Sequence, residues 1–155
     1  SMPSPLPERP ASAGSTLPEA AAPAANYVPF VQIGDILHVS GQLPGVPGAL
    51  VMGQLGAGLN IEEGVAAARA CALNLLGQVR AACGGDIDRL ERVVKITGFV
   101  NSAPEFGDQP KVINGASDFL VEALGEPGRH ARSAVGVSAL PFGVAVEIEG
   151  LFQIR

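Results

Sequence analysis

Hydrophobic residues recur along this chain with two periods, one typical of helices and the other of strands. From residue 61 to about residue 83, apolar side chains return every three or four positions, which places them on one face of a helix. Asn60 and Glu63 form a capping-box pattern at the start of this segment, and Gly84-Gly85 follows its end. The pattern predicts an amphipathic helix whose apolar face consists of Ile61, Val65, Ala68, Ala72, Leu75, Leu76 and Val79.

A second helical region is predicted to follow residue 101. Pro110 suits the first turn of its main helix, where a missing N–H group costs nothing, and Gly125 suits the helix end. The same three- and four-residue steps predict an apolar stripe made of Val112, Ile113, Ala116, Phe119, Leu120 and Leu124.

Strands are predicted where apolar and β-branched residues form short runs. Residues 27–33 and 36–40 flank the turn Gly34-Asp35, a pattern typical of a β-hairpin. Further strands are expected at 91–100, 132–139 and 144–154, with residues 140–143 as the turn between the last two. The glycine-rich stretch 41–59 is predicted to be a long loop.

The order β-β-α-β-α-β-β predicts a single α+β domain over residues 25–155, with two helices on one face of a mixed sheet. The other sheet face is also apolar and has no helix left to cover it, which favours self-association. Residues 1–24 are rich in proline, alanine and serine, and we expect them to form a flexible or wrapping arm.

Charge and composition narrow the functional classes. The chain has 155 residues and a formal net charge of −5, and it lacks a long basic cluster, which argues against nucleic-acid binding. The sequence has no apolar run of membrane-spanning length and no signal-peptide pattern, so the cytoplasm is the expected location. Cys71 and Cys83 lack a metal-binding spacing and are interpreted as packed thiols, with a disulfide or a reactive thiol as the alternative.

Several common chemistries have no matching motif in the sequence. The sequence has no phosphate-binding Gly-Lys-Ser/Thr loop, and the glycines at 53–58 lack the strand–helix context of a dinucleotide site. His38 and His130 are far apart, which disfavours a histidine-based metal site. Ser40-Gly41 has no activating group nearby in sequence and no Gly-x-Ser-x-Gly pattern, so a serine nucleophile is not expected.

Arg132 is the strongest candidate for a functional residue. It begins a strand of small and apolar residues, where a guanidinium group needs an anionic partner. That partner is either an internal carboxylate, Glu147 or Glu149, or the carboxylate of a ligand, with Glu147 as a base or water-orienting group. A simple hairpin at 140–143 would place Gly136 opposite Glu147. Arg132 and Glu147 would then share a sheet face, on the order of 13 Å apart at ~3.3 Å per residue.

One ligand could touch both Arg132 and Glu147 only through a bulge, a long reach or a neighbouring subunit.

The other candidate residues carry an ordinary structural interpretation as well. Tyr27, the only tyrosine, is a core or interface aromatic or a phenol at a site rim. Asn114 is a helix-surface amide or a polar group aimed at a cleft, and Arg129 and His130 are capping or subunit-contact residues or ligand-binding residues.

Two segments resemble the hallmarks of the RidA/YjgF family, also labelled endoribonuclease L-PSP or translation-inhibitor-like. The first is the run from Ala131 to Val135 that continues through Leu140-Pro141-Phe142-Gly143 to Glu149, and the second is Val39 to Pro44. The resemblance covers residues 23–155. It implies a fold similar to chorismate mutase and a homotrimer with ligand clefts between its subunits.

The resemblance also implies a reaction, the hydrolysis of an enamine or 2-imino carboxylate to a 2-keto acid and ammonia, without a metal or cofactor. The arginine matching Arg132 would bind the substrate carboxylate, and the glutamate matching Glu147 would place the attacking water. Tyr27, Gly41 and Asn114 match further site positions. Deaminating members commonly carry cysteine where this chain has Ala134, and Arg129 and His130 indicate a divergent subgroup.

Three functions remain open at this point. The first is an imine/enamine deaminase acting on small carboxylates. The second is a non-catalytic trimer that binds keto acids or similar metabolites through Arg132. The third is a ribonuclease or translation inhibitor, which the acidic chain disfavours.

Overall fold

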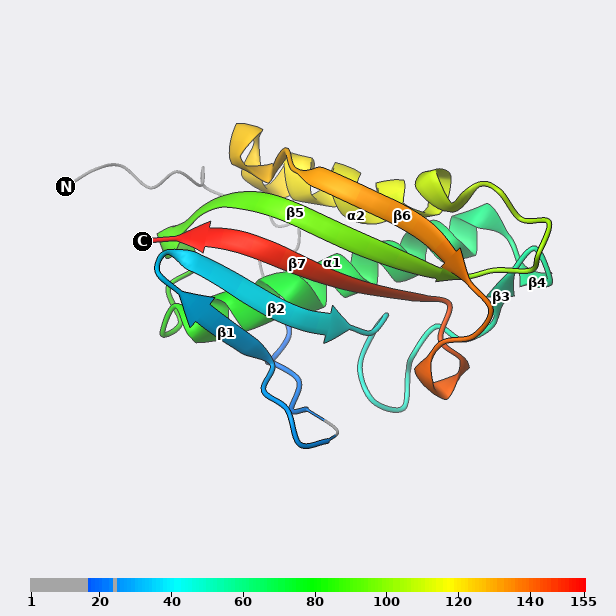
Figure 1. Cartoon of the computed structure of the whole chain (residues 1–155), viewed down its shortest axis with the longest axis horizontal. Helices are drawn as coiled ribbons and strands as arrows, with labels where there is room; N and C mark the ends of the chain where they lie inside the picture. Colours follow the sequence, from blue (N-terminus) through cyan, green and yellow to red (C-terminus); the bar gives the residue numbers. More distant parts are fainter. Residues whose placement is uncertain (1–16, 24) are drawn as a thin grey trace.

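The structure, a computed structural model, describes residues 17–23 and 25–155. Its centre is a five-stranded sheet in which β5 and β6 are parallel and the other neighbours are antiparallel (Figure 1). In spatial order the strands are β1 (Phe30–Ile33), β2 (Ile36–Gln42), β7 (Val146–Ile154), β5 (Leu90–Asn101) and β6 (Ala131–Val137).

Two helices, α1 (Ile61–Ala82) and α2 (Gln109–Leu124), lie side by side behind this sheet in Figure 1. The predicted α+β order and the layer of two helices on one face are therefore confirmed. Asn60 accepts a hydrogen bond from the Glu63 amide at 2.8 Å, and the Glu63 carboxylate accepts from the Asn60 amide at 3.1 Å. The predicted capping box thus starts α1.

The glycine-rich loop contains two short strands that the sequence did not predict, β3 (Gln54–Leu55) and β4 (Gly58–Leu59). A strand of two residues is too short to produce a visible alternation of apolar and polar positions. The described residues also contain three short 3₁₀ helices: η2 (Ile87–Arg89), η3 (Glu126–Gly128) and η4 (Pro141–Gly143).

The predicted hairpin between the last two strands is wrong. β5 lies between β6 and β7, so residues 140–143 connect strands that are not neighbours. Gly136 lies beside Val100, whereas Glu147 lies beside Phe99. The reason is the connection through α2, which returns the chain parallel to β5 and leaves the other side of β5 for the last strand.

The core fills the space between the sheet and the helices, with Phe119 and Phe152 among its largest fully buried side chains. Cys71 and Cys83 are both buried and unpaired, as predicted. The helices approach each other closely at Gly115, where a Cβ atom would overlap the Val65 carbonyl. None of the helices in the described residues is long and apolar enough to cross a membrane.

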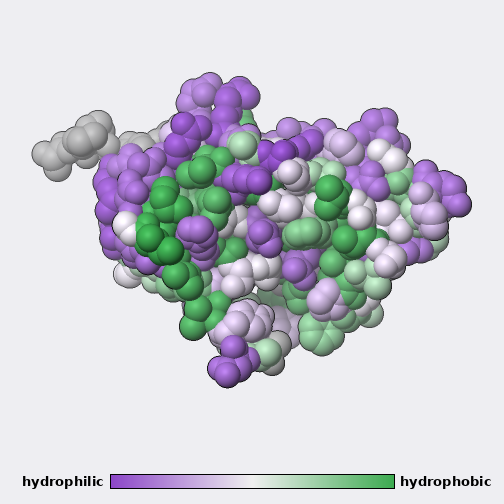
Figure 2. Space-filling view, in the orientation of Figure 1, coloured by the Kyte–Doolittle hydropathy of each residue, from purple (hydrophilic) through white to green (hydrophobic). Residues whose placement is uncertain are grey.

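The opposite sheet face carries no helix of the described chain. Figure 2 shows this face, where hydrophobic side chains in green lie between hydrophilic ones in purple. Val31 and Val135 are 48% and 44% exposed there. These two valines lie on the two edge strands of the sheet, β1 and β6.

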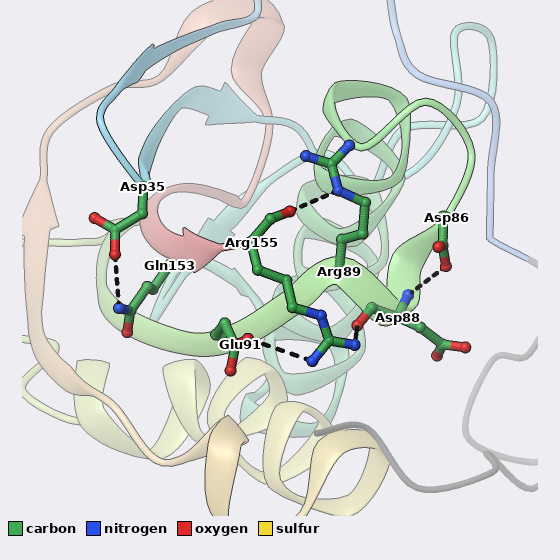
Figure 3. Close-up of polar contacts among 7 residues, drawn as sticks. All are labelled: Asp35, Asp86, Asp88, Arg89, Glu91, Gln153 and Arg155. Atoms are coloured by element: carbon green, nitrogen blue, oxygen red, sulfur yellow. Dashed lines mark hydrogen bonds and ion pairs between the residues drawn. The ribbon is translucent and has the colours of Figure 1, made fainter. Parts of the chain in front are cut away.

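The end of β7 is fastened to the start of β5 by polar contacts (Figure 3). Arg155 donates to the Glu91 carboxylate at 3.3 Å and to the Asp88 carbonyl at 2.9 Å, and its own carbonyl accepts from Arg89 at 2.6 Å. Gln153 donates to Asp35 at 2.8 Å across to the β1–β2 turn. These contacts stabilise the end of the sheet that is opposite the candidate site.

Residues 17–23 lie against α1. Arg80 donates to the carbonyls of Leu17 and Pro18, both at 3.1 Å, and Leu17 is buried. The rest of the predicted arm, residues 1–16 and 24, lies outside the described residues.

Candidate functional site

A cavity of about 730 Å³ opens beside Glu147. Its wall combines residues 21–23 and 27–29, the end of β2 with the following loop, α1, and the segment before β7 with the start of β7 itself. The lining residues are Ala21, Ala22, Pro23, Tyr27, Pro29, Ser40, Gly41, Gln42, Leu43, Gly45, Pro47, Gly48, Leu50, Asn74, Pro141, Phe142 and Glu147.

A β-bulge shapes the floor of this cavity. Val39 pairs with Gly150 and Gln42 with Ile148, so Ser40 and Gly41 together stand opposite one residue of β7. A Cβ atom on Gly41 would overlap the Glu147 carboxylate and lie 2.9 Å from its Cδ atom. A side chain at this position would therefore displace the Glu147 carboxylate from where it now lies.

Glu147 is a half-buried carboxyl with no hydrogen bond or ion pair to the described residues. Burial and, secondarily, the negative charge of Glu149 raise its pKa above the ordinary value. A carboxyl group of this kind exchanges protons more readily near neutral pH, which is the property that general acid–base catalysis needs.

Arg132 lies elsewhere, between β6 and α2. Its guanidinium donates to the Ser117 hydroxyl at 3.0 Å and to the Pro110 carbonyl at 3.2 Å. Both acceptors are neutral, and the ion pairs of the described residues include neither Glu147 nor Glu149 with this arginine. The predicted alternative of an internal salt bridge is therefore wrong.

His130 completes a chain of hydrogen bonds behind Arg132. The Gly128 carbonyl can only accept, so His130 Nδ1 carries the proton that it donates there, at 2.5 Å. His130 Nε2 then accepts from the Ser117 hydroxyl at 2.9 Å, which leaves a Ser117 lone pair for Arg132. Burial lowers the pKa of His130, and the positive charge of Arg132 lowers it further, while the Gly128 contact opposes the shift. The neutral ring is thus the favoured form.

The remaining predicted residues take different places. Asn114 is exposed on α2, four residues after Pro110 and three before Ser117, on the helix stripe that contacts Arg132. Ala134 follows two residues after Arg132 on the same strand face and packs against the core. Arg129 points to the surface, where it pairs with Glu126 at 3.0 Å.

Arg132 and Glu147 lie on opposite faces of the sheet, contrary to the prediction. Arg132 pairs with Ile96, which is buried under the helices, whereas Glu147 pairs with Phe99, three residues further along β5. Neighbouring positions on a strand alternate between faces, so an odd separation reverses the side. One chain therefore carries two separate candidate half-sites: the Glu147 cavity with Tyr27 and Gly41, and the Arg132 cluster with His130 and Ser117.

Sequence reasoning missed three residues that shape these half-sites. Asn74 donates from α1 to the carbonyls of Leu43 and Gly45, both at 2.8 Å, and so holds the cavity loop. Phe142 is 67% exposed at the cavity and has a φ of 60°. Ser117, two helical turns after Pro110, could have been found from that spacing once α2 was known to face Arg132.

Comparisons with known proteins identify a family for this chain. Residues 8–149 match the family described as "YjgF/chorismate_mutase-like, putative endoribonuclease". The chain is 57% identical over 144 residues to protein TCP17 of Trypanosoma cruzi, covering 92% of this chain and 89% of that protein. It is 49% identical to the crystal structure of Atu1372 from Agrobacterium tumefaciens, described as a protein with unknown function, with a TM-score of 0.87 over 94% of this chain and 89% of the other.

A more distant likeness concerns a ligand complex. The crystal structure of E. coli TdcF with bound serine is 23% identical and superimposes with a TM-score of 0.62, covering 88% of this chain and 94% of the other. That likeness shows a shared fold. With a chorismate-mutase-like α+β fold and the family match over most of its length, this chain belongs to the YjgF/RidA/RutC family.

Proposed function

We propose that this protein hydrolyses reactive 2-imino and enamine carboxylates to 2-keto acids and ammonia. The observation that carries the proposal is the state of Arg132. Its guanidinium is held by a hydroxyl and a carbonyl, with no carboxylate paired to it in the described residues. A positioned guanidinium whose neighbours are neutral is suited to the carboxylate of a ligand.

The Glu147 cavity supplies the second requirement. An imine carbon is already electrophilic, so the protein needs to orient the substrate and provide water. Glu147 accepts a proton as water adds to the protonated imine, and the neutral tetrahedral carbinolamine forms. The same carboxyl then returns this proton to nitrogen. As the C–N bond breaks, the Glu147 carboxylate takes the proton of the carbinolamine hydroxyl, so that ammonia leaves and the carbonyl of the keto acid remains. The raised pKa of Glu147 suits both directions of this transfer.

We propose that the working site forms between two copies of the chain. Within one chain, Arg132 and Glu147 point to opposite sides of the sheet with β5 between their strands. β6, which carries Arg132, is an edge strand, and no helix of the described chain covers the open sheet face. A closed ring, a homotrimer as the family resemblance implies, would bring Arg132 of one copy to the Glu147 cavity of the next.

Ala134 favours a second candidate, a non-catalytic protein that binds small carboxylates such as keto acids. The deaminating relatives commonly carry cysteine at this position, and alanine offers no group for proton transfer. Both candidates require Arg132 to bind a carboxylate, and only the deaminase requires turnover. Ammonia release therefore separates them.

The test is ammonia release from 2-aminoacrylate, generated in place from serine by a dehydratase. We expect wild type to accelerate release and Arg132→Ala to return the rate to that of the uncatalysed control. Arg132→Lys keeps the charge but loses the forked geometry, so it should recover only part of the rate. A wild type that binds pyruvate without accelerating ammonia release would establish the non-catalytic candidate. Ala134→Cys would then test whether the alanine at this position is the reason that turnover is missing.

A further inference from the structure

Residues 21–23 form part of the cavity wall, and their position is fixed by the segment before them. Arg80 holds the carbonyls of Leu17 and Pro18, as described above. Gly77 permits the close approach, because a Cβ atom there would lie 2.8 Å from the Pro18 carbonyl oxygen. The backbone of residues 17–18 therefore rests directly on α1, and the chain continues from there into the cavity wall.

A buried glutamine connects this wall to the floor of the cavity. Gln78 is fully buried on α1, and its amide donates to the Ala21 carbonyl at 3.0 Å. The same amide lies 3.4 Å from Gln42 Oε1, and Gln42 in turn donates to the Ser40 carbonyl at 2.9 Å. The wall and the bulge beside Glu147 therefore belong to one polar network.

The cavity has one polar region and a larger apolar one. Glu147, Ser40 and Gly41 supply polar groups from the strands. The apolar side chains come from three other segments: Ala21, Ala22 and Pro23, then Leu43, Pro47 and Leu50, and finally Pro141 and Phe142. Within one chain the cavity has a volume of about 730 Å³, and a three-carbon imino acid held at its polar groups would leave the apolar walls uncovered.

We infer that residues 21–23 are a specificity element that selects 2-imino acids with apolar side chains, of leucine to phenylalanine size, over 2-aminoacrylate. The inference rests on the proposed function and names its substrate class. The imino group lies beside Glu147, the carboxylate binds Arg132 of the neighbouring copy, and the side chain lies against the wall of residues 21–23 and the loop opposite. Each methylene buried there favours the larger substrate.

The experiment compares two imines and two variants of the full chain. The leucine imine is made in place by an amino-acid oxidase, and 2-aminoacrylate is made by the dehydratase. Ala22→Phe fills the cavity from an exposed position, where the larger side chain does not disturb the core. Ala20→Phe is the matched control, since Ala20 is also exposed but does not line the cavity.

We expect wild type to have the higher kcat/KM for the leucine imine. Ala22→Phe should lower the ratio of the two kcat/KM values by roughly tenfold or more, and Ala20→Phe should keep the wild-type ratio. Calorimetric binding of 4-methyl-2-oxopentanoate and pyruvate provides a second readout without turnover. Circular dichroism and gel filtration verify that both variants fold and assemble as wild type does.

Two different results would overturn the inference alone. One is a wild type that hydrolyses 2-aminoacrylate as well as or better than the leucine imine, and the other is an Ala22→Phe ratio equal to that of Ala20→Phe. A wild type that hydrolyses neither imine and binds neither keto acid would instead overturn the proposed function, and this inference with it.

Discussion

Ser117 and His130 share a hydrogen bond of 2.9 Å, and the hydroxyl that makes it also accepts from Arg132. The guanidinium that we assign to substrate binding is thus oriented through a serine and a neutral histidine. Neither partner carries a charge that would compete with a ligand carboxylate for the arginine.

Replacing Ser117 by alanine should therefore weaken carboxylate binding while leaving the fold in place. The loss of one hydrogen bond to a charged group, worth about 1.5–3 kcal/mol, should raise KM by roughly ten- to a hundredfold and change kcat less. Steady-state kinetics on the preferred imine measures the split. Asp118→Ala, at the exposed neighbouring position, is the control. A fall in kcat with an unchanged KM would contradict the assignment.

His130 should make stability fall on mild acidification. Burial holds its pKa in the folded protein below that of the unfolded chain, so the unfolded chain binds the proton more tightly. The free energy of unfolding should therefore decrease as the pH falls from about 6.5, the value for an unperturbed histidine, through the lower folded pKa. Above that range this contribution is constant. Urea titrations at several pH values give the free energy of unfolding at each. Its decrease with falling pH should be smaller for His130→Asn than for wild type, and an equal decrease would refute the prediction.

Gly41→Ala should reduce activity by roughly tenfold or more, since displacement of a catalytic group by even one ångström is costly. The added methyl group would overlap the Glu147 carboxylate and push it out of the cavity. Gly107→Ala is a suitable control, because a Cβ atom at Gly107 would meet no atom within 4 Å. Comparable activity losses in both variants would point to a general effect of the substitution.

Mixing two inactive variants tests the placement of the site between chains. Arg132→Ala keeps Glu147, and Glu147→Gln keeps Arg132. In closed rings assembled at random from equal amounts, about a quarter of the sites would receive both native residues from adjacent copies. Co-refolded or co-expressed mixtures should recover about that fraction of wild-type activity. A site contained within one chain would give none.

The sequence predicted the parts of the fold that depend on local signals. The Asn60 capping box, the apolar stripe of α2 and the turn at Gly34 are encoded within a few residues each, and the structure confirms them. The predicted stripe of α1 is confirmed from Ala68 to Val79, whereas Ile61 and Val65 are only partly buried. Pairing between distant strands has no such local signal. The neighbours of β6 and β7 could not be derived from the turn at 140–143. The expected pairing of Gly136 with Glu147 was therefore wrong as well.

The same distinction applies to the candidate site. Arg132 and Glu147 were identifiable as residue types that need partners, but the sheet face of each depended on the strand order. Ser117 and Gln78 act through contacts between elements far apart in the chain, and no motif marks them. The bulge at Ser40 and Gly41 involves one extra residue, which a periodic pattern cannot locate to that precision.

Tyr27 gives the cavity a spectroscopic signal of its own. The chain has 1 tyrosine and 0 tryptophans, so its tyrosine emission comes entirely from a ring that lines the cavity. That ring is 50% exposed, and a ligand that enters the cavity would change its contact with water. Fluorescence of the unlabelled protein therefore reports occupancy of this one cavity, and a ligand bound elsewhere would leave it unchanged unless the cavity itself moved.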